Sequence, residues 1–263
     1  NKDDPEILKQ SIIRLTLHEV GHTLGLNHNF KASFLHDSKE VHNKELTQRV
    51  GLTSSVMEYP AVNLAPLGVK QGDYYDTRTG PYDLWAIEFG YKPHLTAEER
   101  KLLLSKSNLH EHMFANDSED MRSAGKGIDP RAMIGDLSSE PIVYSEQRIE
   151  LVNDTILKLP SLLVGKASSW EEYRNAYKIL LRETARSLDT VSRYVGGVYI
   201  NRSTPAQESD QLPYEPVPSS KQKEAMRVLA DHAFSVNAFP INSELLNLLQ
   251  IERRGFDLYE EHE

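Results

Sequence analysis

The chain has 263 residues and a formal net charge of −9, and it contains no basic stripe of the kind that binds nucleic acid. Hydrophobic residues make up 39% and charged residues 26%, which is typical of a soluble globular protein with a substantial core. The apolar runs are too short to span a bilayer. The lack of cysteine excludes disulfides and thiol catalysis and gives no indication of the redox compartment.

The first element that the sequence predicts is a helix over residues 5 to 24. Asp4 is a suitable N-cap, Pro5 suits the first helical turn, and Gly25 can take the left-handed conformation that ends a helix. Spacings near three and four predict that one side of this helix is buried, namely the side of Ile7, Leu8, Ser11, Ile12, Leu15, His18, Val20 and His22.

A metal-binding motif occupies the end of this helix. His18 and His22 lie four residues apart and share one helix face, and His28 follows the turn at Gly25 as a third ligand. Three neutral imidazoles leave a position of Zn²⁺ open for water, and Glu19 can accept the proton of that water. A single helical histidine is usually a packed or surface residue. The full spacing H-E-x-x-H-x-x-G-x-x-H arises by chance only on the order of 10⁻⁴ per chain of this length, so we expect Zn²⁺ as the cofactor.

A second motif, SVMEYP, follows at residues 55 to 60. With both motifs present, the sequence resembles the metzincin clan of zinc peptidases, whose extended zinc motif is followed by a turn containing methionine. The resemblance implies that Met57 forms a hydrophobic floor beneath the ligands, and that Tyr59 ligates zinc or donates a hydrogen bond to the reaction intermediate. A neutral phenol suits the donor role. Without the upstream motif, core packing of Met57 and an interface position of Tyr59 would be the simpler interpretations.

Further blocks narrow this resemblance to the large bacterial zinc-dependent metalloproteases of the clan: HNFKAS, GPYDLWAIEFGY and RYVGGVYINR. The resemblance covers most of the chain and implies a zinc endopeptidase with a polypeptide substrate, in a periplasmic, cell-surface or secreted location. Two alternatives stay open, namely a non-catalytic binding or scaffold module that retains a zinc site, and a zinc hydrolase of a non-peptide amide. The intact Glu19 favours an enzyme, because a structural zinc site needs no base.

The remaining pattern predicts helices joined by long loops. Capping boxes are expected at Thr96 with Glu99 and at Ser169 with Glu172, and the segment VYINRS alternates like a strand. The proline-rich run from Pro205 to Pro218 is interpreted as a linker or a surface arm. Helices are expected over residues 82–89 ended by Gly90, 97–106, 144–158 ended by Pro160, 170–194, 220–234 capped by Ser219 or Ser220, and 243–250 capped by Asn242.

These elements predict a mainly α fold with few short strands, in which a metzincin lower lobe carries a helical C-terminal extension. Residues 1–92 would hold the zinc-motif helix, the methionine turn and the lower lobe, and residues 93–263 the extension packed on it. Only 17 residues precede His18, too few for the sheet of an upper lobe, so we expect the missing N-terminal part of the parent chain as a partner. The isolated chain should then show little or no peptidase activity, and the apolar side of the first helix should be partly exposed.

Other clusters give weaker signals. Asp73, Asp76 and Asp83 are candidates for a calcium site, although their spacing fits no known loop. His110 and His112 are interpreted as surface residues, and the segment FANDSEDM as a solvated loop.

Overall fold

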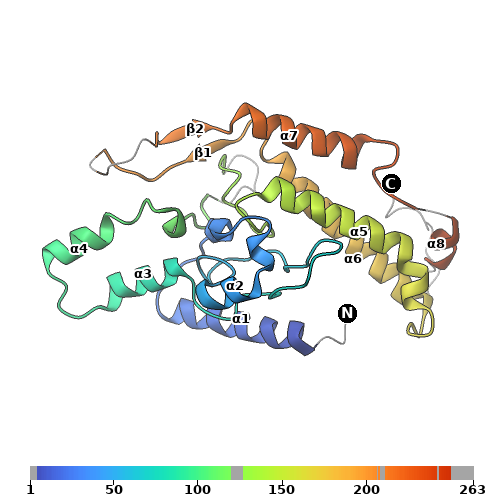
Figure 1. Ribbon diagram of the computed structural model, residues 1–263, viewed down its shortest axis with the longest axis horizontal. Coiled ribbons are helices and arrows are strands. Elements are labelled where there is room, and N and C mark those ends of the chain that lie inside the picture. The colour runs from blue at the N-terminus through green and yellow to red at the C-terminus, as the bar shows by residue number, and fades with distance from the viewer. Residues whose placement is uncertain (1–4, 120–126, 206, 208–210, 242, 250–263) are drawn as a thin grey trace.

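Helices make up most of the described structure, which confirms the predicted mainly α fold (Figure 1). The computed structural model describes residues 5–119, 127–205, 207, 211–241 and 243–249, so the predicted caps Asp4 and Asn242 lie outside the described residues. In Figure 1, α1 (Pro5–Thr23) lies along one edge of the molecule, and α7 (Ser219–Leu229) lies along the opposite edge. Of the helices that are described, none has both the length and the apolar character needed to cross a membrane.

Helix α1 covers nearly the predicted span. It ends at Thr23, and the amide of Leu24 still donates to the carbonyl of Val20 at 3.1 Å. Gly25 follows with a φ of 84°, a left-handed conformation that side chains other than glycine rarely adopt. The predicted stop at Gly25 is therefore confirmed.

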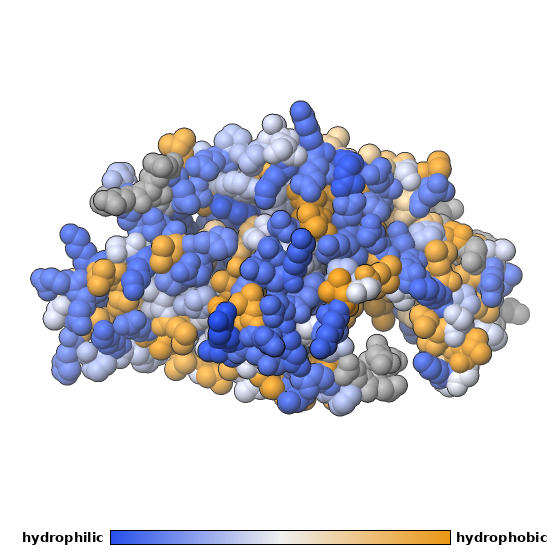
Figure 2. Space-filling view, in the orientation of Figure 1, coloured by the Kyte–Doolittle hydropathy of each residue, from blue (hydrophilic) through white to orange (hydrophobic). Residues whose placement is uncertain are grey.

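The predicted buried side of α1 is wrong. Leu8, Ile12 and Leu15 are 64%, 57% and 54% exposed, while Gln10, His18 and Gly21 are the buried residues of the helix. Hydrophobic atoms accordingly appear along the edge of the surface where α1 lies (Figures 1 and 2). The expectation that the apolar side of this helix is partly exposed agrees with the structure.

Polar contacts explain why α1 turns this other side inward. The side-chain amide of Gln10 donates to Asp73 at 2.9 Å, and its oxygen accepts from the amide of Tyr74 at 2.6 Å. Arg14 donates to the carbonyl of Glu58 at 2.9 Å. The inner side of α1 thus supplies partners for loop groups that would otherwise be buried without a hydrogen bond.

The segment between α1 and α3 (Pro81–Tyr91) is mostly irregular, and residues 61–80 form the predicted loop. It contains two short 3₁₀ helices, Ala32–Leu35 and Glu40–His42, followed by α2 (Lys44–Val50). A small apolar cluster of Val41, Leu52, Leu137 and Tyr144 packs this segment against α5 (Pro141–Leu163).

After the loop come α3, α4 (Ala97–Leu104) and a 3₁₀ turn at His110–His112. The predicted stop at Gly90 is wrong, because α3 continues through Tyr91; a glycine costs only about 1 kcal/mol within a helix. The predicted capping box of α4 is confirmed. Glu99 donates its amide to the Thr96 hydroxyl at 3.1 Å, and the Glu99 carboxylate accepts from the Thr96 amide at 2.9 Å.

Helices α5 and α6 (Trp170–Ser192) form an antiparallel pair (Figure 1). Pro160 was predicted to end α5, but it lies inside the helix, so this prediction is wrong. Packing carries the helix past the proline, since Leu159 on α5 belongs to a cluster with Val152, Ile156, Tyr177, Leu245 and Leu249.

The predicted capping box of α6 is wrong. Ser169 makes no capping bond, and the carboxylate of Glu172 accepts instead from the amide of Ser168, one residue earlier, at 3.1 Å.

The predicted strand VYINRS forms β1 (Val198–Ile200), which pairs antiparallel with β2 (Tyr214–Pro216). Part of the proline-rich run is therefore a strand rather than a linker or arm. Ser219 and Ser220 do not cap α7, because Pro218 is its N-cap and both serines lie within the helix. A π-helical turn (Ala230–Phe234) continues α7, and α8 (Ser243–Leu248) packs on the α5–α6 pair.

One cluster of the core joins the N-terminal part of the chain to the C-terminal helices. Phe34, six residues after His28, packs with residues in α5, α6 and α7 and in the segments that follow α6 and precede α7, namely Ile142, Val191, Tyr194, Val217, Ala225 and Val228. The loop that carries the third histidine is thereby fixed on the C-terminal helices.

A pair of buried carboxyl groups links the methionine turn to the loop before α5. Glu58 accepts from the amide of Ser33 at 3.1 Å, and Asp136 accepts from the hydroxyl of the same serine at 3.1 Å. Burial raises the pKa of Asp136 to about 7. Burial, followed by the charge of Asp136, raises the pKa of Glu58 well above its usual value. Asp136 therefore holds a proton in the folded chain at pH values where an unfolded aspartate is ionised.

This shift predicts a loss of stability with rising pH. A carboxyl group whose pKa is higher in the folded than in the unfolded chain does not destabilise the fold below the unfolded pKa. As the pH rises from the unfolded pKa to the folded pKa, the free energy of unfolding falls. From about pH 4 to about pH 7 the urea midpoint of the zinc-free chain should fall more steeply in the wild type than in Asp136→Asn. Identical pH dependence in the two proteins would contradict the assignment.

Candidate metal centre

The structure brings the three predicted histidines together. The ligand nitrogens of His18, His22 and His28 all lie within 4.8 Å of one another, and no other group of described histidines and acidic residues has this geometry. His18 and His22 come from the last turns of α1, and the turn at Gly25 returns the chain so that His28 faces them. The ring centroids are 4.8 to 5.4 Å apart.

Each imidazole is oriented by a hydrogen bond at Nδ1. The acceptors are the carbonyl of Val56 for His18 at 2.8 Å, the carbonyl of Leu26 for His22 at 3.1 Å, and the carboxylate of Asp117 for His28 at 2.9 Å. Because these oxygens can only accept, each Nδ1 carries the proton and each Nε2 keeps a free lone pair. The three lone pairs are the donor set that a zinc ion requires.

The residues fit a metal by a second observation. The Nε2 atoms of His18 and His28 are buried and have no hydrogen-bond partner, a costly arrangement unless another group binds there. Burial lowers the pKa of His18, which favours the neutral imidazole that coordinates metal.

Met57, for which the resemblance implies a floor beneath the ligands, packs against the zinc-motif helix at Gly21. Its side chain is fully buried, and its sulfur contacts the Cα of Gly21 so closely that a Cβ there would overlap it. The glycine between the first two histidines is therefore the residue that lets the methionine turn approach α1. The Met57 carbonyl also accepts from the amide of Asn29, next to His28, at 3.1 Å.

Asp83 holds the methionine turn in place. Its carboxylate accepts from the hydroxyl of Ser55 at 2.6 Å and from the amides of Val56 and Gly80 at 2.9 Å. The first two bonds fix the backbone whose Val56 carbonyl orients His18, so Asp83 acts on the metal centre through the turn.

The calcium interpretation of Asp73, Asp76 and Asp83 is wrong. All three side chains are buried, and each accepts hydrogen bonds from different protein groups: Asp73 from Gln10 and Thr47, Asp76 from the amides of Leu52 and Thr53, and Asp83 from the turn. Burial raises the pKa of Asp76 to about 6. These aspartates organise loops.

Tyr59 lies beside the histidines. Its ring centroid is 4.7 Å from that of His18 and 4.9 Å from that of His28. Arg14, which the sequence did not single out, places its guanidinium carbon 5.3 Å from the centre of the Tyr59 ring. No described group bonds the Tyr59 hydroxyl, so it is available to a ligand.

Glu19 lies between the first two histidines on α1, and its side chain is exposed. Within the described ranges it has neither a hydrogen-bond nor an ion-pair partner, in contrast to the buried carboxylates around the site. No described group therefore holds its carboxylate in place.

Asp117 is the residue that the sequence interpretation missed. It belongs to the segment FANDSEDM, which was interpreted as solvated, and 89 positions separate it from His28. Backbone pairing brings it there, because Phe30 donates its amide to Ala115 at 2.8 Å and the segments run past each other. No local sequence signal indicates this contact.

The surface interpretation of the other two histidines is wrong for His112. It is 8% exposed, stacks on Trp85 with centroids 4.9 Å apart, and bonds the carbonyl of Lys106. His110 is exposed, although its Nε2 lies 2.7 Å from the carbonyl of Phe34.

The donor set predicts one zinc ion per chain. Elemental analysis of protein purified without chelator should give close to one equivalent, and His22→Ala should lower the zinc content sharply because two imidazoles remain. The matched control is His94→Asn, which changes an exposed histidine away from the cluster. Unchanged zinc binding by His22→Ala would refute the ligand assignment.

Asp117→Asn should weaken zinc binding by about 10- to 100-fold, because it removes the carboxylate that orients His28. Competition with a chelator measures the effect. Asp231→Asn is the control, since the Asp231 side chain is 58% exposed and that of Asp117 is 64% exposed. Equal affinity of the wild type and Asp117→Asn would show that the contact does not support the metal centre.

Comparison with known proteins agrees with the geometry. The sequence model of the Met-zincin family matches residues 1–262, almost the whole chain. Searches of curated proteins and of solved structures gave no significant match. The histidine cluster over a buried methionine and the family match lead to the same conclusion: this chain belongs to the Met-zincin family of zinc-dependent metallopeptidases.

Proposed function

We propose that this chain hydrolyses peptide bonds with His18, His22 and His28 as zinc ligands, Glu19 as general base and Tyr59 as a hydrogen-bond donor to the reaction intermediate. When bound, zinc supplies a Lewis acid that polarises the scissile carbonyl and acidifies a water molecule. The single observation that carries the proposal is the convergence of three oriented imidazoles, and the next residue after the first of them, Glu19, has an exposed carboxylate without a described partner.

Each side chain has a separate task in this mechanism. Glu19 accepts a proton from the attacking water and can return it to the leaving amine. Tyr59 donates a hydrogen bond from its hydroxyl to the oxygen on which negative charge develops. The guanidinium of Arg14 lies against the Tyr59 ring and keeps the phenol beside His18 and His28.

The contacts of Met57 and Asp83 support this assignment of roles. These two residues act on the ligands indirectly. Met57 belongs to the turn whose Val56 carbonyl orients His18, and Asp83 accepts a hydrogen bond from the amide of Val56. Neither residue is required to touch substrate. The exposed position of Glu19 and His22 leaves the substrate side of the cluster accessible.

Glu19→Gln should keep zinc and lose nearly all turnover, because the amide preserves the shape of the side chain but accepts no proton. Cleavage of a random peptide library, with zinc content measured in parallel, tests this expectation. Glu45→Gln, at an exposed position on α2, is the matched control. Cleavage by Glu19→Gln at the rate of an active wild type would exclude the mechanism.

Tyr59→Phe should also keep zinc, and its kcat should fall by about 10- to 1000-fold, the effect of removing one donor to an oxyanion. KM should change less than kcat, because the bond forms with charge that develops in the transition state. If kcat stays at the wild-type value, Tyr59 has no role in the chemical step.

Three further expectations stay predictions. These are the extracytoplasmic location, the division of the chain at residues 92 and 93, and the weak activity of the isolated chain without a further N-terminal lobe.

A further inference from the structure

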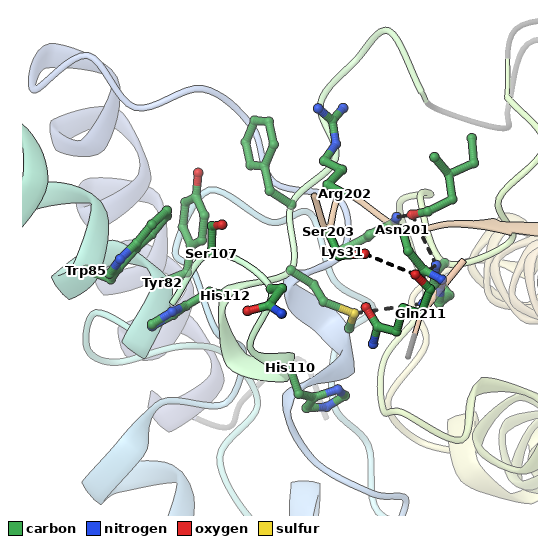
Figure 3. A pocket seen from close by; sticks show the side chains of 15 residues that line it. Lys31, Tyr82, Trp85, Ser107, His110, His112, Asn201, Arg202, Ser203 and Gln211 are labelled. Carbon is green, nitrogen blue, oxygen red and sulfur yellow. Dashed lines mark hydrogen bonds between the residues drawn. The ribbon is translucent and has the colours of Figure 1, made fainter. Parts of the chain in front are cut away.

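A cavity of about 330 Å³ with a mixed apolar and polar lining lies between α3 and the β1–β2 hairpin. In Figure 3, Tyr82, Trp85 and His112 lie on one side of it, and Asn201, Arg202 and Gln211 lie on the other. One wall is therefore aromatic, and the other carries a cation and amides.

This cavity is connected to the metal centre through two paired segments. Lys31, which lines the cavity, follows His28 by three residues, so the Cα atoms of these two residues lie at most about 11 Å apart. On the paired segment, Phe114 lines the cavity and Asp117 bonds His28. A peptide held at the metal centre would span this distance with about three or four extended residues.

Positive charge is in excess in the wall of the cavity. The buried ammonium of Lys31 donates to Asp129 at 2.8 Å, and Arg131 donates to the same carboxylate at 2.8 and 3.0 Å. Burial would raise the pKa of Asp129, but these bonds outweigh it and lower the pKa. The buried ammonium of Lys31 and the partly buried guanidinium of Arg131 thus share one carboxylate, although buried charges are normally matched one to one.

Two guanidinium groups on this wall can donate to a further anion, one through a weakly bonded nitrogen and the other in competition with a carboxylate. The Nη1 of Arg131 contacts only the sulfur of Met113, at 4.0 Å, and sulfur is a weak acceptor. The Arg202 side chain is 55% exposed and forms an ion pair with Glu119 at 2.6 Å. Around the cavity, the described part of the chain supplies three cations against two carboxylates, in a protein whose net charge is −9.

We propose that this cavity is a substrate subsite that binds a carboxylate of the peptide, about three or four residues from the scissile bond, with Arg131 and Arg202 as donors and Tyr82 and Trp85 as the apolar wall. The carboxylate is an acidic side chain or the C-terminus of the peptide. This inference rests on the proposed peptidase function, but binding can be measured without catalysis.

The test uses tryptophan fluorescence of the zinc-free chain. The sequence has two tryptophans, so Trp170→Phe leaves Trp85, in the cavity wall, as the only reporter. Four hexapeptides of one sequence carry either Gln or Glu at an inner position and either an amide or a free acid at the C-terminus. A peptide whose carboxylate fits the cavity should bind about 10-fold or more tightly than the peptide with Gln and a C-terminal amide. A preference for Glu over Gln assigns the cavity to an acidic side chain, and a preference for the free acid over the amide assigns it to the C-terminus.

Two variants should change this preference in opposite directions. Arg202→Gln should reduce it, whereas Glu119→Gln should increase it, because the variant frees Arg202 from its competing carboxylate. Arg49→Gln, at an exposed position on α2, should leave it unchanged. Equal binding of all four peptides, or a preference that neither cavity variant alters, would overturn the proposal. This assay measures peptide binding without zinc, whereas the Glu19→Gln experiment measures cleavage. A failure of the subsite proposal can therefore be distinguished from a failure of the proposed peptidase function.

Discussion

The metal centre depends on three hydrogen bonds at the Nδ1 atoms of its histidines. Each bond fixes a tautomer and a ring orientation, and together they direct three Nε2 lone pairs to one point. The acceptors come from three different places in the chain, namely the methionine turn, the turn after α1, and the loop that contains Asp117. The loops around the metal centre fix the positions of these acceptors.

Buried carboxylates stabilise these loops by accepting hydrogen bonds from backbone amides. Asp76 and Asp83 each accept at least two backbone amides, and Glu58 bonds the loop that follows His28. Regular secondary structure is sparse between α1 and α3, so side chains satisfy the backbone groups that a sheet would otherwise pair. Desolvation of these groups is costly, and the raised pKa of Asp76, about 6, reflects that cost.

The environment of α1 differs on its two sides. Its inner side is small or polar, because Gln10 and Arg14 bond loop groups and Gly21 admits Met57. Leu8, Ile12 and Leu15 lie on the exposed side. Periodicity in the sequence located the apolar side correctly, but the rule that apolar residues are buried did not decide which side faces the protein.

The sequence by itself identified the three histidines that the structure brings together, His18, His22 and His28, and it predicted the mainly α class. It also named Glu19 as the candidate base and Tyr59 as the candidate donor. Short-range geometry explains this, because a spacing of four residues along a helix places two imidazoles on one face. The helix end at Gly25 also depends on local conformation and not on contacts with distant parts of the chain. Helix ends were determined less well, because packing carries α5 past Pro160.

Only the tertiary structure decided which residues support the site. The contact of Asp117 with His28 joins positions 89 apart, the loop roles of Asp73, Asp76 and Asp83 depend on partners elsewhere in the chain, and the cavity beside Lys31 requires the β1–β2 hairpin to lie against α3 and its neighbours. A sequence pattern carries information about neighbours on one element. Partners brought together by the packing of distant loops leave no such pattern, because any polar residue at those positions would look like a solvated surface.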